Sequence, residues 1–537
     1  MSSKPVQDAH IFVLVHGLWG GPNHMLTIEK SIKELLDSDD SSKEKIVTIR
    51  PSSFRFWKTY DGLQLNAERV VSDVLYEIEM LKSENNIKVT KISFVGYSLG
   101  GLISRYAIGI LNEIGFFDKV QPMIFSTFAT PHVGVHFFQQ NAFDILANEL
   151  GKYLFGKSGN EMFMGDDELI LKKMADPEHK FYKGLKRFKK HILLANVKND
   201  RTVAFFTSYI TDYSPFEEWD KVKIKYFKDL PQVRIGTSQV KPKFVDFERS
   251  HPLEKENEFS NVQEETSFLR SNKLIRFTLI FIVTILILPI WVPLVLSSSL
   301  FASIYSGVKI KIIKSPKVSK HWERVSSFVY GSCKIDAEDA KIGQDKRNQR
   351  KNLRHHESFK GDTSEITENA MENFMYAEER FTGRSPPPMT TGDDEFPGDD
   401  DDDEDDDEED ETITNNVTDL KVKNTNDVQK AKPKQKIIDV DIEANGKSID
   451  THLSKLYNKD YQKFPLFTKD GILKMDPNRR FIIDSLNELN WIKIPVYIDA
   501  WNAHDGIVAR RGPRTNPKGT ATILLWATLL RRFLQEE

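Results

Sequence analysis

The sequence predicts an α/β protein built on a doubly wound, mostly parallel β-sheet. Short apolar runs of strand length alternate with segments of helical periodicity, as strands buried on both faces require, and each run ends at a turn. The 537 residues are 39% hydrophobic, which is ample for a core. The single cysteine, Cys333, excludes an internal disulfide framework and a CxxC metal or redox site. We expect a reducing compartment and no metal or other cofactor.

Five apolar runs are expected to be strands of this sheet: residues 11–16 (IFVLVH), 92–95 (ISFV), 123–128 (MIFSTF), 192–195 (ILLA) and 494–499 (IPVYID). Between the first two, apolar residues recur at helical spacing from Val71 to Leu81, which predicts a crossover helix. Residues 521–534 predict a further apolar helix, which must pack against another part of the protein. We therefore expect residues 8–250 and 437–537 to form two parts of one core.

Two segments are predicted to interrupt this core. Residues 277–308 are a run of 32 residues without a charged side chain, containing Pro289 and Pro293 and flanked by basic residues at both ends. A straight helix of that length would be about 48 Å long, against roughly 30 Å of hydrocarbon. We predict a membrane-embedded hairpin within residues 273–314; a buried core helix is the alternative. Residues 335–435, rich in Asp, Glu, Lys, Asn and Pro, predict a disordered acidic linker.

The charge pattern indicates no nucleic-acid partner. The net charge is −4, from 75 basic and 79 acidic residues. Residues 399–411 are 13 consecutive acidic residues, and the rest of the chain has more basic than acidic residues. The mildly basic remainder suits an anionic membrane surface or an ordinary solvated surface. The N-terminal ten residues contain Asp8 and lack the apolar core of a signal peptide, so we expect the chain to start in the cytosol.

A nucleophile motif follows the second predicted strand. Residues 96–100 (GYSLG) match G-x-S-x-G and precede a helical run. In this context Ser98 takes a sharp strand-to-helix turn, and Gly96 and Gly100 keep side chains out of its way. A plain glycine-rich turn is the alternative. We predict that Ser98 is the nucleophile of an acyl-transfer reaction.

The loop HGLWGG, residues 16–21, follows the first predicted strand. Backbone amides of such a loop can donate to a tetrahedral oxyanion, together with the amide of the residue after the nucleophile. We assign the oxyanion hole to Leu18 and Leu99, with His16 and Gly17 as supporting residues. Alone, the loop would be interpreted as a turn with a structural histidine.

A serine hydrolase of this kind needs an acid and then a histidine after the serine. Asp200 lies in NDRTV directly after a predicted strand, and Asp176 and Asp212 are the alternatives. His504 lies in AHDGIV after the strand at residues 494–499 and is the predicted base. Asp505 beside it is interpreted as a loop former.

Two other histidines fit the role of base less well. His132, in ATPHVG, precedes Asp200 and therefore violates the usual order, so it is interpreted as lining the pocket. His452 is interpreted as a surface residue in a helical stretch.

Together, VHGLWGG, GYSLGG, ATPHVGV, NDRTV and AHDGIV resemble the putative serine esterase family of the α/β-hydrolase superfamily over residues 8–250 and 480–537. The resemblance implies an α/β-hydrolase fold and a Ser98–Asp200–His504 triad. The acidic linker is no part of the resemblance.

The expected function is hydrolysis of fatty acyl esters of glycerophospholipids at a membrane or lipid-droplet surface, with the catalytic part facing the cytosol. The apolar segment favours phospholipid over soluble esters. A neutral-lipid lipase, an acyl-protein thioesterase and a membrane-tethered scaffold with an inactive fold are the alternatives. Residues 137–155 are expected to form a lid or interfacial cap, or a core helix.

Overall fold

The computed structural model describes residues 6–36, 44–138, 142–216, 222–253, 317–331 and 461–536, with gaps at 229, 231, 236–237 and 501. It also describes residues 438–439, 452 and 456, and parts of 297–310. The predicted linker, residues 335–435, lies outside the described residues, as does the predicted hairpin except for residues within 297–310. No described helix is both apolar enough and long enough to cross a membrane.

The centre of the structure is a six-stranded parallel sheet in the order β11-β5-β4-β3-β1-β2. Its strands are β1 (Gln7–Val15), β2 (Lys45–Ile49), β3 (Ile87–Tyr97), β4 (Gln121–Phe128), β5 (Lys190–Asn196) and β11 (Trp491–Val496). All are parallel, so their carboxyl ends meet at one edge of the sheet, where loops carry function in such folds. The most distant pair in sequence is β5 with β11, from Trp491 beside His191 to Val496 beside Asn196.

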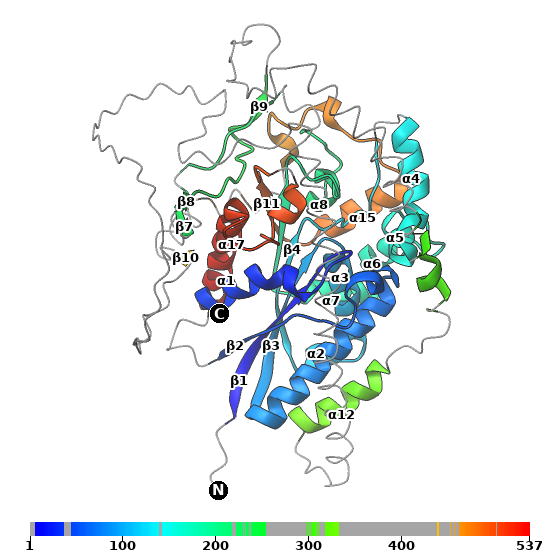
Figure 1. The fold of residues 1–537 in the computed structure, drawn as a ribbon, viewed down its shortest axis with the longest axis vertical. Helices are drawn as coiled ribbons and strands as arrows, with labels where there is room; N and C mark the ends of the chain where they lie inside the picture. The colour runs from blue at the N-terminus through cyan, green and yellow to red at the C-terminus, as the bar shows by residue number, and fades with distance from the viewer. Residues whose placement is uncertain are drawn as a thin grey trace, which may run out of the picture.

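Helices cover both faces of the sheet (Figure 1). On one face lie α1 (Leu26–Leu36) and α17 (Pro517–Gln535), which pack with Phe12 and Leu14 of β1. On the other face, α2 (Leu63–Asn85) and α3 (Leu99–Glu113) pack with Ile11 and Val13 of the same strand. Alternate residues of β1 therefore serve two separate apolar cores, as a strand buried on both faces requires.

Smaller elements complete the described part of the chain. The remaining helices are α4 (Ala142–Leu154), α5 (Gly156–Met162), α6 (Ile170–Ala175), α7 (Lys180–Lys186), α8 (Phe205–Tyr209), α12 (Val318–Tyr330), α15 (Pro477–Asn487) and α16 (Ala503–Gly506). Two small antiparallel sheets contain β6 (Val222–Lys223), β7 (Val233–Ile235), β8 (Ser238–Val240), β9 (His251–Pro252) and β10 (Ile438–Asp439).

The predicted parallel α/β sheet is confirmed, and each of the five predicted strands corresponds to a strand of the structure. The fifth ends at Val496 rather than at residue 499. The crossover helix is α2 and the apolar C-terminal helix is α17. The edge strand β2 is not predicted from the sequence, because its five residues are mostly only partly buried and lack the continuous apolar run of a central strand.

Candidate active site

Ser98 lies between β3 and α3, at the carboxyl edge of the sheet. Its backbone has φ 54° and ψ −129°, a conformation that costs free energy in a residue with a side chain. Non-glycine residues with positive φ also follow three neighbouring strands: Trp19 after β1, Ala129 after β4 and Asn199 after β5. Such strain concentrates at functional sites. Here it marks the carboxyl ends of four adjacent strands.

The sharp turn at Ser98 depends on close backbone packing, which the two motif glycines allow. A Cβ on Gly96 would lie 2.4 Å from Gly101 Cα, and a Cβ on Gly100 would lie 2.1 Å from the carbonyl oxygen of Val15. Both distances are shorter than real Cβ contacts, so any larger residue would push α3 away from β1 and β3. The predicted supporting role of Gly96 and Gly100 thus has a steric basis.

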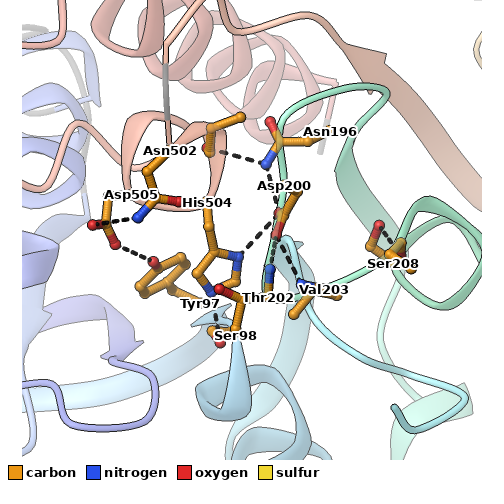
Figure 2. A network of polar contacts seen from close by, with 12 residues as sticks. Tyr97, Ser98, Asn196, Asp200, Thr202, Val203, Ser208, Asn502, His504 and Asp505 are labelled. Carbon is orange, nitrogen blue, oxygen red and sulfur yellow. Dashed lines mark hydrogen bonds and ion pairs between the residues drawn. The ribbon is translucent and has the colours of Figure 1, made fainter. Parts of the chain in front are cut away.

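His504 lies on the short helix α16, which follows β11 at the same edge of the sheet. Its Nε2 lies 2.9 Å from Ser98 Oγ, and its Nδ1 lies 3.0 Å from Asp200 Oδ2 (Figure 2). Ser98 and His504 are each only 6% exposed. The three residues chosen from sequence therefore form one chain of hydrogen bonds, although their catalytic roles stay a prediction.

Asp200 is fixed by the loop that follows β5. Its Oδ1 accepts backbone N–H bonds from Thr202 at 3.1 Å and Val203 at 2.8 Å. Its Oδ2, which faces His504, also accepts from Asn196 Nδ2 at 2.8 Å, and the same amide group donates to Ala503 O at 3.1 Å. Asn196 is not singled out by the sequence, where the only signal is a polar residue at the end of an apolar strand. Asn196 therefore links the loop that carries Asp200 to helix α16, which carries His504.

The Tyr97 ring packs near the imidazole of His504, and Asp505 in turn bonds to Tyr97. The Tyr97 ring lies 5.0 Å from the His504 ring, and its hydroxyl donates to Asp505 Oδ1 at 3.2 Å. Asp505 also accepts from Asn502 Nδ2 at 2.8 Å and pairs with Arg510 at 3.1 Å. Asp505 is therefore more than a loop former. Adjacent residues diverge in direction, so its carboxylate bonds to Tyr97 and Arg510, whereas the imidazole bonds to Asp200.

These carboxylates set the charge state of His504. Burial alone would lower the pKa of His504, but the charge and hydrogen bond of Asp200, with Asp505 adding to them, outweigh burial and raise the pKa above 6.5. The opposite holds at Asp505: burial raises the pKa of that carboxyl, and Arg510 and His504 reverse the effect and lower it. The site therefore favours an imidazole that accepts a proton and holds it beside two carboxylates.

The predicted oxyanion loop lies directly against the serine. A Cβ on Gly17 would lie 2.7 Å from Ser98 Cβ, so only glycine permits this approach. Leu99 is the first residue of α3, and its amide therefore has no acceptor within its own helix. His16 is fully buried against Phe54, its Nδ1 lies 3.0 Å from Gly17 O, and burial lowers its pKa to about 3. His16 is therefore neutral and positions the loop.

The other sequence candidates lie elsewhere. Asp176 Oδ1 accepts from Glu178 N, and Asp212 pairs with Arg480. His132 is wrongly interpreted as lining the pocket: it is fully buried, with Nε2 2.9 Å from Thr127 Oγ1. His452 contacts Lys228 O. Within the described residues, no group of three His, Cys, Asp or Glu side chains is arranged to hold a metal ion.

Comparison with known proteins agrees with this geometry. Residues 5–211 match the family described as "Putative serine esterase (DUF676)". This match covers less than half of the 537 residues. The matched part of the chain contains Ser98 and Asp200, whereas His504 lies beyond it. The resemblance seen in the sequence motifs is thus confirmed for this part of the chain.

Two curated relatives of the chain are yeast proteins named as putative lipases. "Putative lipase C4A8.10" of Schizosaccharomyces pombe is 30% identical over 216 residues, which are 38% of this chain and 27% of the relative. "Putative lipase ROG1" of Saccharomyces cerevisiae is 27% identical over 264 residues, which are 47% of this chain and 36% of the relative. The chain thus spans about a third of the length of these relatives.

A solved structure is also similar to part of the chain. It is an extracellular α/β-hydrolase from a Paenibacillus species, 13% identical, and the match covers 28% of this chain and 51% of that one with a TM-score of 0.17.

The pH dependence of the hydrolysis expected of this site tests the arrangement around His504. Replacing Asp505→Asn removes a negative charge that raises the pKa of His504, whereas the charge of Arg510, which lowers that pKa, remains. Hydrolysis requires a neutral imidazole, so we expect the acidic limb of the kcat/KM profile to move to lower pH. The control is Asp499→Asn, which breaks a pair with Lys518. An unchanged profile in Asp505→Asn would contradict the arrangement.

Proposed function

We propose that the protein is a serine lipid acyl hydrolase that cleaves fatty acyl esters of glycerophospholipids at a membrane or lipid-droplet surface. The observation that carries the proposal is the hydrogen-bond chain from Ser98 through His504 to Asp200, with the serine in a strained turn between strand and helix. The nucleophile, its base and the group that orients the base then act in the order expected of an acyl-transfer site.

In this mechanism, His504 Nε2 takes the proton of Ser98 Oγ as the oxygen attacks the ester carbonyl carbon. The amides of Leu18 and Leu99 donate to the oxyanion that forms. His504 then gives the proton to the departing lysophospholipid oxygen, leaving an acyl-serine. Water, deprotonated by His504, attacks the acyl group and releases the fatty acid. Asp200 keeps Nδ1 protonated and stabilises the imidazolium in both steps.

A membrane or lipid-droplet partner is supported by the charge-free run at residues 277–308. Because β5 precedes this run and β11 follows it in one sheet, both flanks must lie on the same side of any lipid layer. A hairpin or a shallow insertion satisfies this requirement, and either could be accommodated in the phospholipid monolayer of a lipid droplet. We place the protein on lipid droplets or the endoplasmic reticulum membrane, with its catalytic part facing the cytosol.

A neutral-lipid lipase or an acyl-protein thioesterase would use the same triad and oxyanion hole, so substrate distinguishes these alternatives. The test presents purified full-length protein with phospholipid vesicles, triacylglycerol droplets coated with a phospholipid monolayer, and a soluble acyl thioester. We expect release of fatty acid and lysophospholipid, and flotation of the protein with the droplets. Release of fatty acid from triacylglycerol or the thioester alone would overturn the phospholipid assignment, and no hydrolysis would favour an inactive scaffold.

A further inference from the structure

Two helical segments present large apolar side chains to solvent beside one another. On α4, Ile145, Leu150 and Tyr153 are 58%, 43% and 66% exposed. Residues within 300–308 form the second segment, where Phe301 is 71% exposed and Ile304 is 59% exposed. Tyr305 and Val308 continue the same side of this segment, with 56% and 57% exposed. Such side chains are usually buried, so their exposure together marks an interaction surface.

The two segments are joined by hydrogen bonds. Ser303 Oγ donates to Leu154 O at 3.0 Å and accepts from Gly156 N at 3.0 Å, which places it across the end of α4. Ser306 Oγ donates to Asp61 Oδ1, and Asp61 is paired with Arg69 at the start of α2. The polar side of residues 303–308 thus faces the protein. We call the exposed apolar side chains of α4 described above, together with those of Phe301, Ile304, Tyr305 and Val308, the apolar face.

The apolar face adjoins the loops over the candidate active site. α4 follows the carboxyl end of β4, and Figure 1 shows α4, α5 and the residues near 300–308 together on one side of the molecule. Phe155, just after α4, contacts Tyr60 with ring centroids 6.2 Å apart. Tyr60 in turn accepts a hydrogen bond from Trp19 Nε1 at 2.6 Å. Trp19 belongs to the loop that lies against Ser98.

We propose that the apolar face is the surface by which the catalytic domain rests on the acyl-chain region of a phospholipid layer, with the entrance to Ser98 turned toward the lipid. This inference deepens the proposed function and rests on it. Lipid is favoured over a protein partner because residues 301–308 are the end of the charge-free run that begins at residue 277. The two tyrosines suit such a layer, since their rings favour the boundary between hydrocarbon and water.

The first experiment measures lipid contact directly on the full-length chain. Cys333→Ser removes the single cysteine, and Tyr153→Cys, Tyr305→Cys or Val6→Cys then carries an environment-sensitive fluorophore. Val6 is 52% exposed and precedes β1 at the opposite edge of the sheet, so it is the matched control. With vesicles of phosphatidylcholine and an anionic phospholipid, we expect a blue shift and quenching by chain-labelled lipid at 153 and 305, and neither at 6.

The second experiment measures hydrolysis. The double variant Tyr153→Asp/Ile304→Asp places charges on the apolar face, and Val6→Asp is the control. We expect hydrolysis of vesicle phospholipid to fall about tenfold or more in the double variant, because charged side chains oppose insertion, with hydrolysis of a soluble short-chain ester unchanged. If the wild-type chain hydrolyses no phospholipid but the fluorophores still respond to vesicles, the proposed function fails and the lipid-contacting surface stands.

Three outcomes would overturn the inference. The fluorophores at 153 and 305 would be insensitive to vesicles if the face does not meet lipid. They would be blue-shifted before vesicles are added if another part of this chain covers the face. Concentration-dependent association on size exclusion, abolished by the double variant, would show that a second copy covers it.

Discussion

We expect the replacement Ser98→Ala to abolish hydrolysis, with a loss of at least about 10³-fold in kcat, and to leave binding to vesicles unchanged. The methyl group cannot attack the carbonyl carbon, and His504 Nε2 loses the oxygen that lies 2.9 Å away. The free energy of unfolding should change little, because alanine has the same Cβ as serine and residue 98 keeps its position between β3 and α3. The measurement is fatty-acid release from vesicles at saturating lipid, with binding followed by co-flotation.

A fluorophosphonate probe gives an independent readout, since it bonds covalently to an activated serine and reports no lipid chemistry. We expect labelling of the wild type and none of Ser98→Ala. Ser326→Ala is the control, because that serine is on α12 and its hydroxyl donates to Glu323 O, far from the site in sequence and in the fold. Labelling that survives in Ser98→Ala, or disappears in Ser326→Ala, would show that the nucleophile is another residue.

We expect a chain that ends at about residue 335 to lose both activity and cooperative folding. The cut removes His504, and it also removes β11 and α17, which complete the sheet and one of its cores. Trp526 of α17 is fully buried, donates to Ser126 Oγ at 3.1 Å and meets Phe128 edge-on at 5.1 Å. Loss of a single buried tryptophan side chain costs about 3–5 kcal/mol, a large part of the roughly 5–15 kcal/mol by which native proteins are stable.

The matched deletion variant lacks residues 386–411, which include the acidic run, and retains every described element. We expect its thermal unfolding transition and its rate of vesicle hydrolysis to equal those of the full chain. Calorimetry and the lipid assay on the truncated chain and on the deletion variant provide the test. A truncated chain that unfolds cooperatively and hydrolyses lipid would exclude His504 as the base.

The parts of the fold that could be predicted from sequence are those in which the local residue pattern indicates burial. The strands β1, β3, β4, β5 and β11 each contain an apolar run, because both of their faces are buried. Ser98 could be identified because its sharp turn requires glycine two residues away on either side. β2 and β11 are both edge strands, but every residue of β11 is buried, whereas β2 is mostly only partly buried and lacks such a run.

Contacts between distant residues could not be predicted in this way. Asp505 and Tyr97 are 408 residues apart in sequence, and only the fold brings the hydroxyl to the carboxylate. Asn196 is similar, since its amide donates both to Asp200 and to Ala503, which is 307 residues further along the chain than Asn196. His132 shows the reverse error: a histidine in a loop motif suggested a pocket, whereas tertiary packing places it in the core.

The pairing of β5 with β11 also imposes an order in time on the newly made chain. Asp200 and His504 are separated by 304 residues, which a ribosome takes roughly 15–60 s to add at about 5–20 residues per second. Throughout that interval the edge of β5 that β11 will cover has no partner strand, and the apolar run at residues 277–308 is completed before β11 is made. Under the proposed function, the nascent chain could therefore meet a lipid surface before the candidate active site is complete, because the site needs both β11 and α16.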